Sequence, residues 1–246
     1  MTVPRFLVPA DAVYGTHAVL TGPQLRHLRA RRLHVGSHVV LADGMGGQRH
    51  GVVAALDRHQ AVIQVTDERL AQRESTLRLS LAQALLKSDK LDWVVEKATE
   101  LGATELVFFT CARTLGRITA ERHARWMRVA RSAAQQCQRS TVPLIAGPVS
   151  FEEVLTRRAE PLRLFLWEEQ PPGGLATVHQ QHPCASAVLV VVGPEGGFDS
   201  HEADRAAAAG FQLVGLAPRI LRAETAAVAA VTLCQFLWGD LGRSDA

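Results

Sequence analysis

The sequence predicts two domains: a small β-barrel over residues 1–73, then an α/β domain with a mostly parallel sheet over residues 74–246. Three observations support this prediction. Short β-like stretches with turn signals come first, and strands that alternate with helices follow. Hydrophobic residues make up 47% of the 246 residues, which provides for a packed core and excludes extensive disorder.

The first domain is predicted from short apolar and β-branched runs. Strands are expected at residues 5–8, 17–20, 38–42, 51–56 and 61–66. Asp43-Gly44 and Gly46-Gly47 supply a hairpin turn between the third and fourth of these strands. One helix, over residues 23–33, interrupts the series. Several short strands at this spacing are typical of a small barrel.

The second domain is predicted from alternating strand and helix patterns. Strands are expected at residues 77–85, 105–110, 162–167, 185–192 and 211–216, and helices at residues 91–101, 119–139 and 224–238. Two further helices open with capping boxes, formed by Ser150 with Glu153 and by Asp199 with Glu202. Repeated βα units imply a parallel sheet that is covered on both faces, with ligands beyond the carboxyl ends of its strands.

Composition excludes several classes of protein. The longest apolar run, residues 187–192, is far below the ~20 residues that span a bilayer, and no signal peptide is expected at residues 1–8. The four cysteines are scattered, without metal-ligand spacing, so neither a disulfide scaffold nor a metal site is expected. They fit small core residues of a cytoplasmic protein. The net charge of +3 does not by itself indicate a polyanionic partner.

Two segments that leave buried strands are candidates for binding. The first is Val192-Gly193-Pro194-Glu195-Gly196-Gly197-Phe198, whose glycines let backbone amides approach a ligand closely. It matches neither a dinucleotide-binding loop nor a P-loop. The second covers residues 216–226 and places Arg222, Glu224 and Thr225 at a helix start, where polar or anionic groups can be held. Taken singly, each segment also fits an ordinary connection.

Taken together, the two segments resemble the ribosomal RNA small subunit methyltransferase E family, which are enzymes of the SPOUT class. The motifs are G-P-E-G-G-F from residue 193 and L-x-P-R-I-L-R-x-E-T-A from residue 216. Further matches follow in the family's order: residues 4–9, His27-Leu28 with Arg31-Arg32, residues 87–90 and 96–102, and residues 136–139. The resemblance therefore covers nearly the whole chain.

The resemblance implies a PUA-like barrel, joined to a SPOUT domain with a carboxyl-terminal trefoil knot, in a homodimer. It implies S-adenosylmethionine as cofactor, no metal, and methylation of N3 of one uridine near the 3′ end of 16S ribosomal RNA, free or in the 30S particle. The implied cofactor-binding residues are Leu166, Trp167, Val192, Gly193, Pro194, Glu195, Gly196, Gly197, Leu216, Ala217, Pro218, Ile220, Leu221, Arg222 and Thr225. At Ala217 the family usually has glycine.

Three side chains are candidates for catalysis. Uracil N3 carries a proton at neutral pH, so the site needs a base, or cationic donors for the charge that develops on O2 and O4. Arg222 is the candidate for the cationic role. Glu195 or Glu224 could accept the proton, directly or through water, or could orient an arginine. The target base must also be unpaired or flipped outward, because N3 lies on the Watson–Crick edge.

Arginines are concentrated between residues 113 and 139, where seven of them accompany a single acid, Glu121. We call this set the arginine band: Arg113, Arg117, Arg122, Arg125, Arg128, Arg131 and Arg139. A solvated helix face ordinarily also carries acidic residues, so the band favours contacts with RNA phosphates. The predicted RNA-binding residues are Arg113, Arg122, Arg125, Arg128 and Arg139 of the band, and Arg5, His27, Arg31 and Arg32 of the barrel.

Two other functions fit parts of the pattern. A ribose 2′-O-methyltransferase of the same class usually has an early N-x-G-x-x-x-R-type motif, which residues 81–101 lack. A non-catalytic RNA-binding protein of ribosome assembly would keep the arginines but tolerate loss of the glycines, whereas Gly193, Gly196 and Gly197 are intact.

Overall fold

The structure, a computed structural model, describes residues 3–8, 12–70, 74–87, 89–114, 119–157, 159–169, 174–216 and 218–242. The chain forms two compact units. The first comprises residues 1–74 together with 134–142, and the second comprises residues 75–133 and 143–246.

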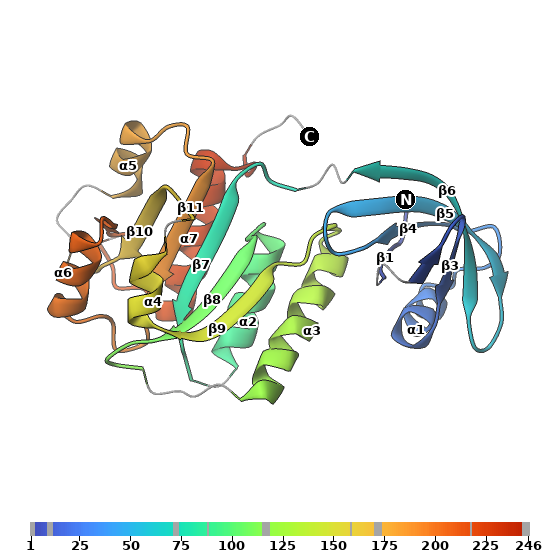
Figure 1. Cartoon of the computed structure of the whole chain (residues 1–246), viewed down its shortest axis with the longest axis horizontal. Coiled ribbons are helices and arrows are strands. Elements are labelled where there is room, and N and C mark those ends of the chain that lie inside the picture. Colours follow the sequence, from blue (N-terminus) through green and yellow to red (C-terminus); the bar gives the residue numbers. More distant parts are fainter. Residues whose placement is uncertain are drawn as a thin grey trace. The chain divides into compact units, whose positions relative to one another are not determined.

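The first unit is a curled six-stranded sheet with one helix, α1 (Gly22–Ala30) (Figure 1). The strand order is β1-β4-β5-β6-β3-β2, with β1 and β4 parallel and the other pairs antiparallel. The strands are β1 (Arg5–Leu7), β2 (Val13–Tyr14), β3 (His17–Leu20), β4 (His38–Ala42), β5 (Gly47–Leu56) and β6 (Ala61–Leu70). Leu28 of α1 packs in one fully buried core with Phe6 and Ile63. The predicted strands and helix of this part are confirmed.

The predicted hairpin turn lies between β4 and β5. Asp43 Oδ1 accepts hydrogen bonds from the backbone N–H groups of Met45 (2.7 Å) and Gly47 (3.0 Å). Aspartate stabilises tight turns in this way because its short side chain reaches its own backbone a few residues on.

Residues 134–142 pack in the first unit around Glu74. The Glu74 carboxylate accepts the backbone N–H groups of Ser140 (2.8 Å) and Thr141 (3.0 Å) and pairs with Arg139 Nη2 at 3.0 Å. Arg139 is only 4% exposed. The prediction that Arg139 belongs to an exposed, RNA-binding band is therefore corrected, because its guanidinium is buried against Glu74.

The second unit contains the predicted parallel sheet, which is confirmed. Its order is β12-β10-β11-β7-β8-β9, and all five neighbouring pairs are parallel (Figure 1). The strands are β7 (Arg78–Ala84), β8 (Glu105–Thr110), β9 (Leu144–Ser150), β10 (Leu162–Leu166), β11 (Ala187–Val192) and β12 (Gln212–Val214). All six side chains of β11 are buried, as expected for a strand covered on both faces.

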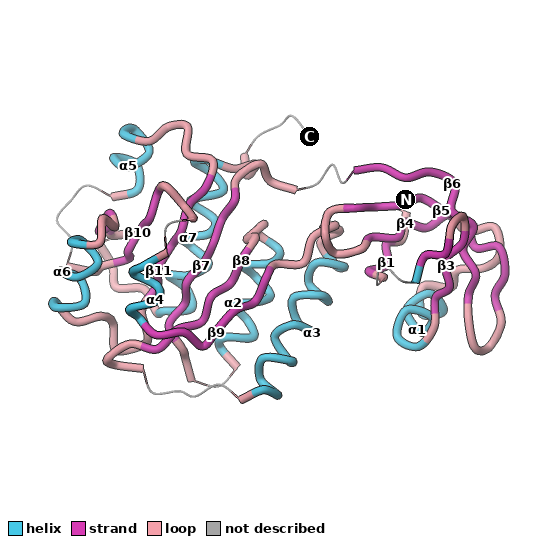
Figure 2. The backbone as a smooth tube through the Cα atoms, viewed as in Figure 1, coloured by secondary structure: helices cyan, strands magenta, loops and turns pink. Residues whose placement is uncertain are grey.

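Helices alternate with these strands along the chain (Figure 2). They are α2 (Lys90–Glu100), α3 (Ala120–Gln136), α4 (Phe151–Thr156), α5 (Leu175–Gln181), α6 (Ser200–Ala208) and α7 (Ala223–Trp238). The capping boxes predicted for α4 and α6 are both present. The sequence did not predict β9, which contains Gly147-Pro148, or α5, which is too short to show helical periodicity.

Helices cover both faces of the sheet because successive side chains of a strand point to opposite sides. Phe109 of β8 joins a buried cluster with Phe151 of α4 and Ala203 of α6. Its neighbour Phe108 lies on the other face, with its ring centroid 4.1 Å from that of Trp126 of α3.

The four cysteines are free thiols. Cys234 of α7 is fully buried, and burial raises the pKa of its thiol to about 12. Cys184 is exposed, which corrects the expectation that all four are core residues. In the described part of the chain, no helix is long and apolar enough to cross a membrane, and no group of three potential metal ligands occurs.

Candidate active site

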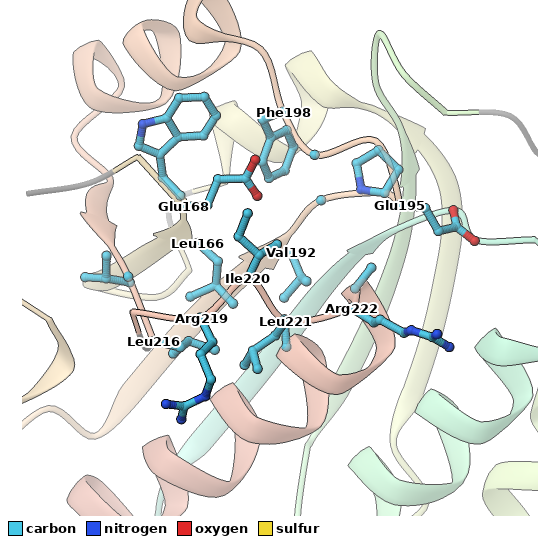
Figure 3. Close-up of a pocket in the computed structure, with 18 of the residues that line it drawn as sticks. Leu166, Glu168, Val192, Glu195, Phe198, Leu216, Arg219, Ile220, Leu221 and Arg222 are labelled. Carbon is cyan, nitrogen blue, oxygen red and sulfur yellow. The ribbon is translucent and has the colours of Figure 1, made fainter.

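The two candidate segments meet at the carboxyl edge of the second sheet. They line a cavity of about 350 Å³ beyond three neighbouring strands, β10, β11 and β12 (Figure 3). Binding sites for small molecules typically enclose about 300–1,000 Å³, so the cavity is large enough for such a ligand. Residues more than 20 positions apart along the chain come together here because parallel strands end at the same edge.

Most of the predicted cofactor-binding residues line this cavity. They are Leu166, Trp167, Val192, Gly193, Pro194, Glu195, Gly197, Leu216, Pro218, Ile220, Leu221 and Arg222. Gly196 and Thr225 are not among the lining residues, and Ala217 lies outside the described residues. That these residues hold a cofactor stays a prediction.

The loop at residues 193–198 needs two of its glycines for different reasons. A Cβ on Gly193 would come within 3.0 Å of the ring of Phe198, so only glycine fits without a shift. Gly197 has a φ of +67°, a left-handed conformation that favours glycine. Phe198 itself is buried, and its ring centroid lies 4.2 Å from that of Phe165 in β10. The loop is therefore anchored in the core at its carboxyl end.

Gln83, the next-to-last residue of β7, anchors the loop at its other end, and the sequence analysis missed it. This side chain is 1% exposed, and its Nε2 donates to the carbonyl oxygens of Gly193 (3.1 Å) and Ala84 (3.0 Å). An amide in an otherwise apolar strand is the signal that could have identified it, because a buried polar group requires hydrogen-bond partners.

Arg113 contacts the same loop from the segment that follows β8. Its Nη1 donates to the carbonyl oxygens of Gly196 (2.8 Å) and Phe198 (3.2 Å). From the sequence, Arg113 is predicted to contact RNA phosphates. In the structure the guanidinium is instead engaged by backbone carbonyls of the loop that lines the cavity.

A charged cluster lies at one side of the cavity, and we call it the charged rim: Lys90, Glu195 and Arg222, which line the cavity, and Glu224, which is not among the lining residues but pairs with Lys90. Lys90 Nζ lies 3.4 Å from Glu195 Oε1 and 3.3 Å from Glu224 Oε2. Arg222 is the N-cap residue of α7, is exposed and lines the cavity. In Figure 3, Glu195 and Arg222 lie to one side of the apolar side chains around Val192 and Leu221.

Glu195 is held as a carboxylate. Partial burial raises its pKa, but hydrogen bonds from the backbone N–H of Lys87 (3.1 Å) and from Lys90 outweigh that effect, so the pKa is lowered overall. A carboxylate with a lowered pKa is a weaker proton acceptor. This environment suits Glu195 to positioning Lys90 more than to taking up a proton.

The opposite side of the cavity carries a carboxylate that the sequence analysis did not select. Glu168 lies two residues after the end of β10 at Leu166, lines the cavity and is exposed. A Cβ on Gly197 would lie 3.4 Å from Glu168 Oε1, so this carboxylate lies beside the glycine loop (Figure 3). Its place at the carboxyl end of a parallel strand is the signal that could have identified it.

The remaining arginines of the band differ in their surroundings. Arg125 is exposed on α3, but its Nε lies 2.5 Å from Asp92 of α2. Arg122 lies over the ring of Trp126 at 5.6 Å, and Arg128 is exposed. Arg117 lies outside the described residues.

The predicted RNA-binding residues of the first unit also differ in their exposure and in their hydrogen-bond partners. Arg5 donates to Gln48 Oε1 (2.9 Å) and to the Ser140 hydroxyl and is partly buried. His27 Nε2 accepts from Arg31 Nε (3.2 Å), and burial, followed by the charge of Arg31, lowers the pKa of His27. Arg31 and Arg32 are exposed. These two arginines are therefore the most accessible cations of the predicted set in this unit.

The sequence matches two known families in the same order as the two units. Residues 20–66 match the RNA methyltransferase PUA domain, and residues 73–235, more than half of the chain, match the RNA methyltransferase domain. The chain belongs to the ribosomal RNA small subunit methyltransferase E family. These matches confirm the predicted family and the PUA-like first domain.

Curated relatives and solved structures extend the match over nearly the whole chain. The protein from Synechocystis is 32% identical over 92% of this chain and 75% of its own length. The structure of the Neisseria gonorrhoeae protein bound to S-adenosyl methionine has a TM-score of 0.88, is 33% identical, and covers 98% of this chain and 100% of that one. A Legionella pneumophila putative methyltransferase, in complex with the bound cofactor SAM, has a TM-score of 0.82 and is 26% identical, with coverage of 98% and 100%.

Proposed function

We propose that this RNA methyltransferase transfers a methyl group from S-adenosylmethionine to N3 of one uridine near the 3′ end of 16S ribosomal RNA. One observation carries the proposal: both family motifs meet around a single cavity, with cations at its rim. Two relatives of the same fold were crystallised with S-adenosylmethionine, which supports this cofactor.

The residues of the cavity fit such a cofactor. Apolar side chains such as Leu166, Val192 and Leu221 suit a flat heterocycle, and the glycine loop leaves backbone groups open to polar contacts. When bound, S-adenosylmethionine supplies an electrophilic methyl group on a sulfonium. The role of the chain is then to hold this group in line with the acceptor atom.

We assign a different role to each residue of the charged rim. Arg222 is assigned to the negative charge that develops on the uracil oxygens, because its exposed guanidinium lines the cavity. Glu195 positions Lys90 through their ion pair. Glu224 is assigned to take up the N3 proton through water, because it follows the cavity-lining residues Arg222 and Ala223 in the chain. Its Oε2 is buried and pairs with Lys90 Nζ at 3.3 Å, so Oε1 is the oxygen assigned to this role.

We assign RNA binding to residues 1–73 and catalysis to residues 74–246. Arg31, Arg32 and His27 of α1 and its flank supply the first contact region. The second contact region lies on α3 and consists of Arg122, Arg125 and Arg128. These cations are accompanied on this helix by a single acidic residue, Glu121. The proposal extends to a homodimer with a carboxyl-terminal trefoil knot that acts in the cytoplasm on RNA or on the assembled 30S particle.

Mass mapping of modified nucleosides tests the proposed function. Small-subunit RNA from a strain lacking this gene should lack one N3-methyluridine near its 3′ end, and a plasmid-borne copy should restore it. A plasmid-borne Gly193→Ala variant serves as the negative control, because the added Cβ would lie 3.0 Å from the ring of Phe198. Loss of a ribose 2′-O-methyl group, or no change in modification, would contradict the proposal.

A further inference from the structure

Lys90 is a cation of the charged rim that lines the cavity and is paired with two carboxylates. It begins α2, lines the cavity, and its side chain is 33% exposed. Its two carboxylate partners come from different elements, Glu195 from the loop after β11 and Glu224 from the first turn of α7. The ammonium is therefore held from two sides at the mouth of the site, within reach of a base presented from solvent.

The chemistry proposed for this site needs a positive charge at such a place. When the N3–H bond breaks, its electron pair stays on the uracil and spreads over O2 and O4, and the proton passes through water to Glu224 or onward to solvent. A fixed cation beside either oxygen favours the ionised base, because the interaction grows as the charge develops. Lys90 and Arg222 both line the cavity, so each can lie beside one of the two uracil oxygens.

We infer that Lys90 is a catalytic residue that binds a carbonyl oxygen of the target uracil and stabilises its N3-ionised form. The inference rests on the proposed function. The carboxylates of Glu195 and Glu224 fix the position of the Lys90 ammonium, leaving its third proton for the base. Three cations line the cavity, Lys90, Arg219 and Arg222, and we assign the second oxygen to Arg222, the one at the charged rim.

A purely structural role for Lys90 makes a different prediction. If its ammonium only kept the two carboxylates together, loss of that ammonium would loosen the loop after β11 and the start of α7. Cofactor affinity would then fall, and the ionisation of a bound base would not change. The charged groups that contact Lys90 are Glu195 and Glu224, Asp89 precedes it in the chain, and Arg222 lines the same cavity. Since none of these is altered in the test below, a change in ionisation reports on Lys90 itself.

The first test measures ionisation without methyl transfer. The probe is a 3′-terminal 16S RNA fragment with 5-fluorouridine at the methylated position, bound to the cofactor-free protein and followed by fluorine NMR across pH. Lys90→Gln should lower the ionised fraction of N3 at a given pH on the order of tenfold relative to wild type. Lys97→Gln is the matched control, because the substitution removes the same charge from α2. Lys97 pairs with two carboxylates, those of Glu96 and Glu100, and lies outside the cavity lining. Identical titrations for wild type and Lys90→Gln would overturn the inference.

The second test uses the substrate's own acidity. Fluorine at C5 acidifies N3, so a 5-fluorouridine substrate depends less on a stabilising cation. Lys90→Gln should slow single-turnover methylation of reconstituted small subunits on the order of 10- to 100-fold with uridine, and by a smaller factor with 5-fluorouridine. An equal loss on both substrates would overturn the inference and leave the proposed function standing. Failure of the wild type to methylate N3 would overturn the proposed function, and with it this inference.

Discussion

Replacing Arg113 by methionine separates a cofactor-loop role from an RNA-binding role. The change keeps an unbranched side chain and removes two hydrogen bonds, to the carbonyl oxygens of Gly196 (2.8 Å) and Phe198 (3.2 Å). Hydrogen bonds from charged donors contribute about 1.5–3 kcal/mol each when buried, and less where water competes. Because Arg113 is exposed, we expect the pair to contribute about 1–2 kcal/mol to holding the loop.

This free energy becomes a binding penalty if the loop must be ordered to hold the cofactor. The dissociation constant for S-adenosylmethionine should then rise about 5- to 30-fold in Arg113→Met, because each 1.4 kcal/mol corresponds to about tenfold. Isothermal titration calorimetry measures this directly. Arg128→Met is the matched control, since Arg128 is exposed on α3 and lies outside the cavity lining, so its cofactor affinity should equal that of the wild type.

RNA binding by the same variants completes the test. Arg113→Met should leave the salt dependence of RNA affinity nearly unchanged, whereas a phosphate contact would lower its slope by about 0.7–0.9. Unchanged cofactor affinity together with a reduced salt slope would contradict a loop-anchoring role for Arg113 and support its prediction as a phosphate contact. Circular dichroism at the assay temperature establishes that both variants are folded.

Three further predictions concern the rim, the helix α3 and the first unit. Arg222→Gln should abolish methyl transfer while cofactor and RNA affinities persist, and normal turnover would exclude it from catalysis. Joint replacement of Arg122, Arg125 and Arg128 by Gln should lower the salt slope of RNA binding by about 2, since Asp92 already pairs with one of them, and an unchanged slope would contradict an RNA role. Burial raises the pKa of Glu74, but its interactions with Thr141, Arg139 and Ser140 lower that pKa overall from 4.5. The ionised Glu74 therefore stabilises the fold above pH 4.5, and this stabilisation is lost as the pH falls through the folded-state pKa. Glu74→Gln should therefore be less stable than wild type to urea at pH about 7, and the difference should shrink as the pH falls below 4.5; a constant difference would contradict this sign.

The elements of the fold were predictable wherever periodicity extends over a whole element. Residues of β11 form a continuous apolar run, those of α2 recur at helical spacing, and both capping boxes lie within four residues of sequence. These signals are local, so the sequence carries them completely. The prediction was incomplete at β9, where glycine and proline interrupt the pattern of a strand that the sheet nevertheless includes.

The site was predictable in part, for a related reason. Glycine and proline around Glu195 constrain the backbone by their own covalent structure, and their position after a buried strand places them at the ligand edge. Contacts made by long charged side chains were not predictable. Arg113 and Arg139 belong to one run of arginines in the sequence, yet one binds loop carbonyls and the other is buried against Glu74.

The sequence was enough to predict most of the strands and helices, the two cavity loops and the family, because each depends on neighbouring residues or on a fixed motif; β9 and α5 were the exceptions. Tertiary structure alone decided which charges meet. Lys90 lies 105 residues from Glu195, and Gln83 lies 110 residues from Gly193, so no local pattern encodes either contact. The parallel sheet brings them together because it gathers the carboxyl ends of strands from distant parts of the chain at one edge, and burial there then selects which polar groups must pair.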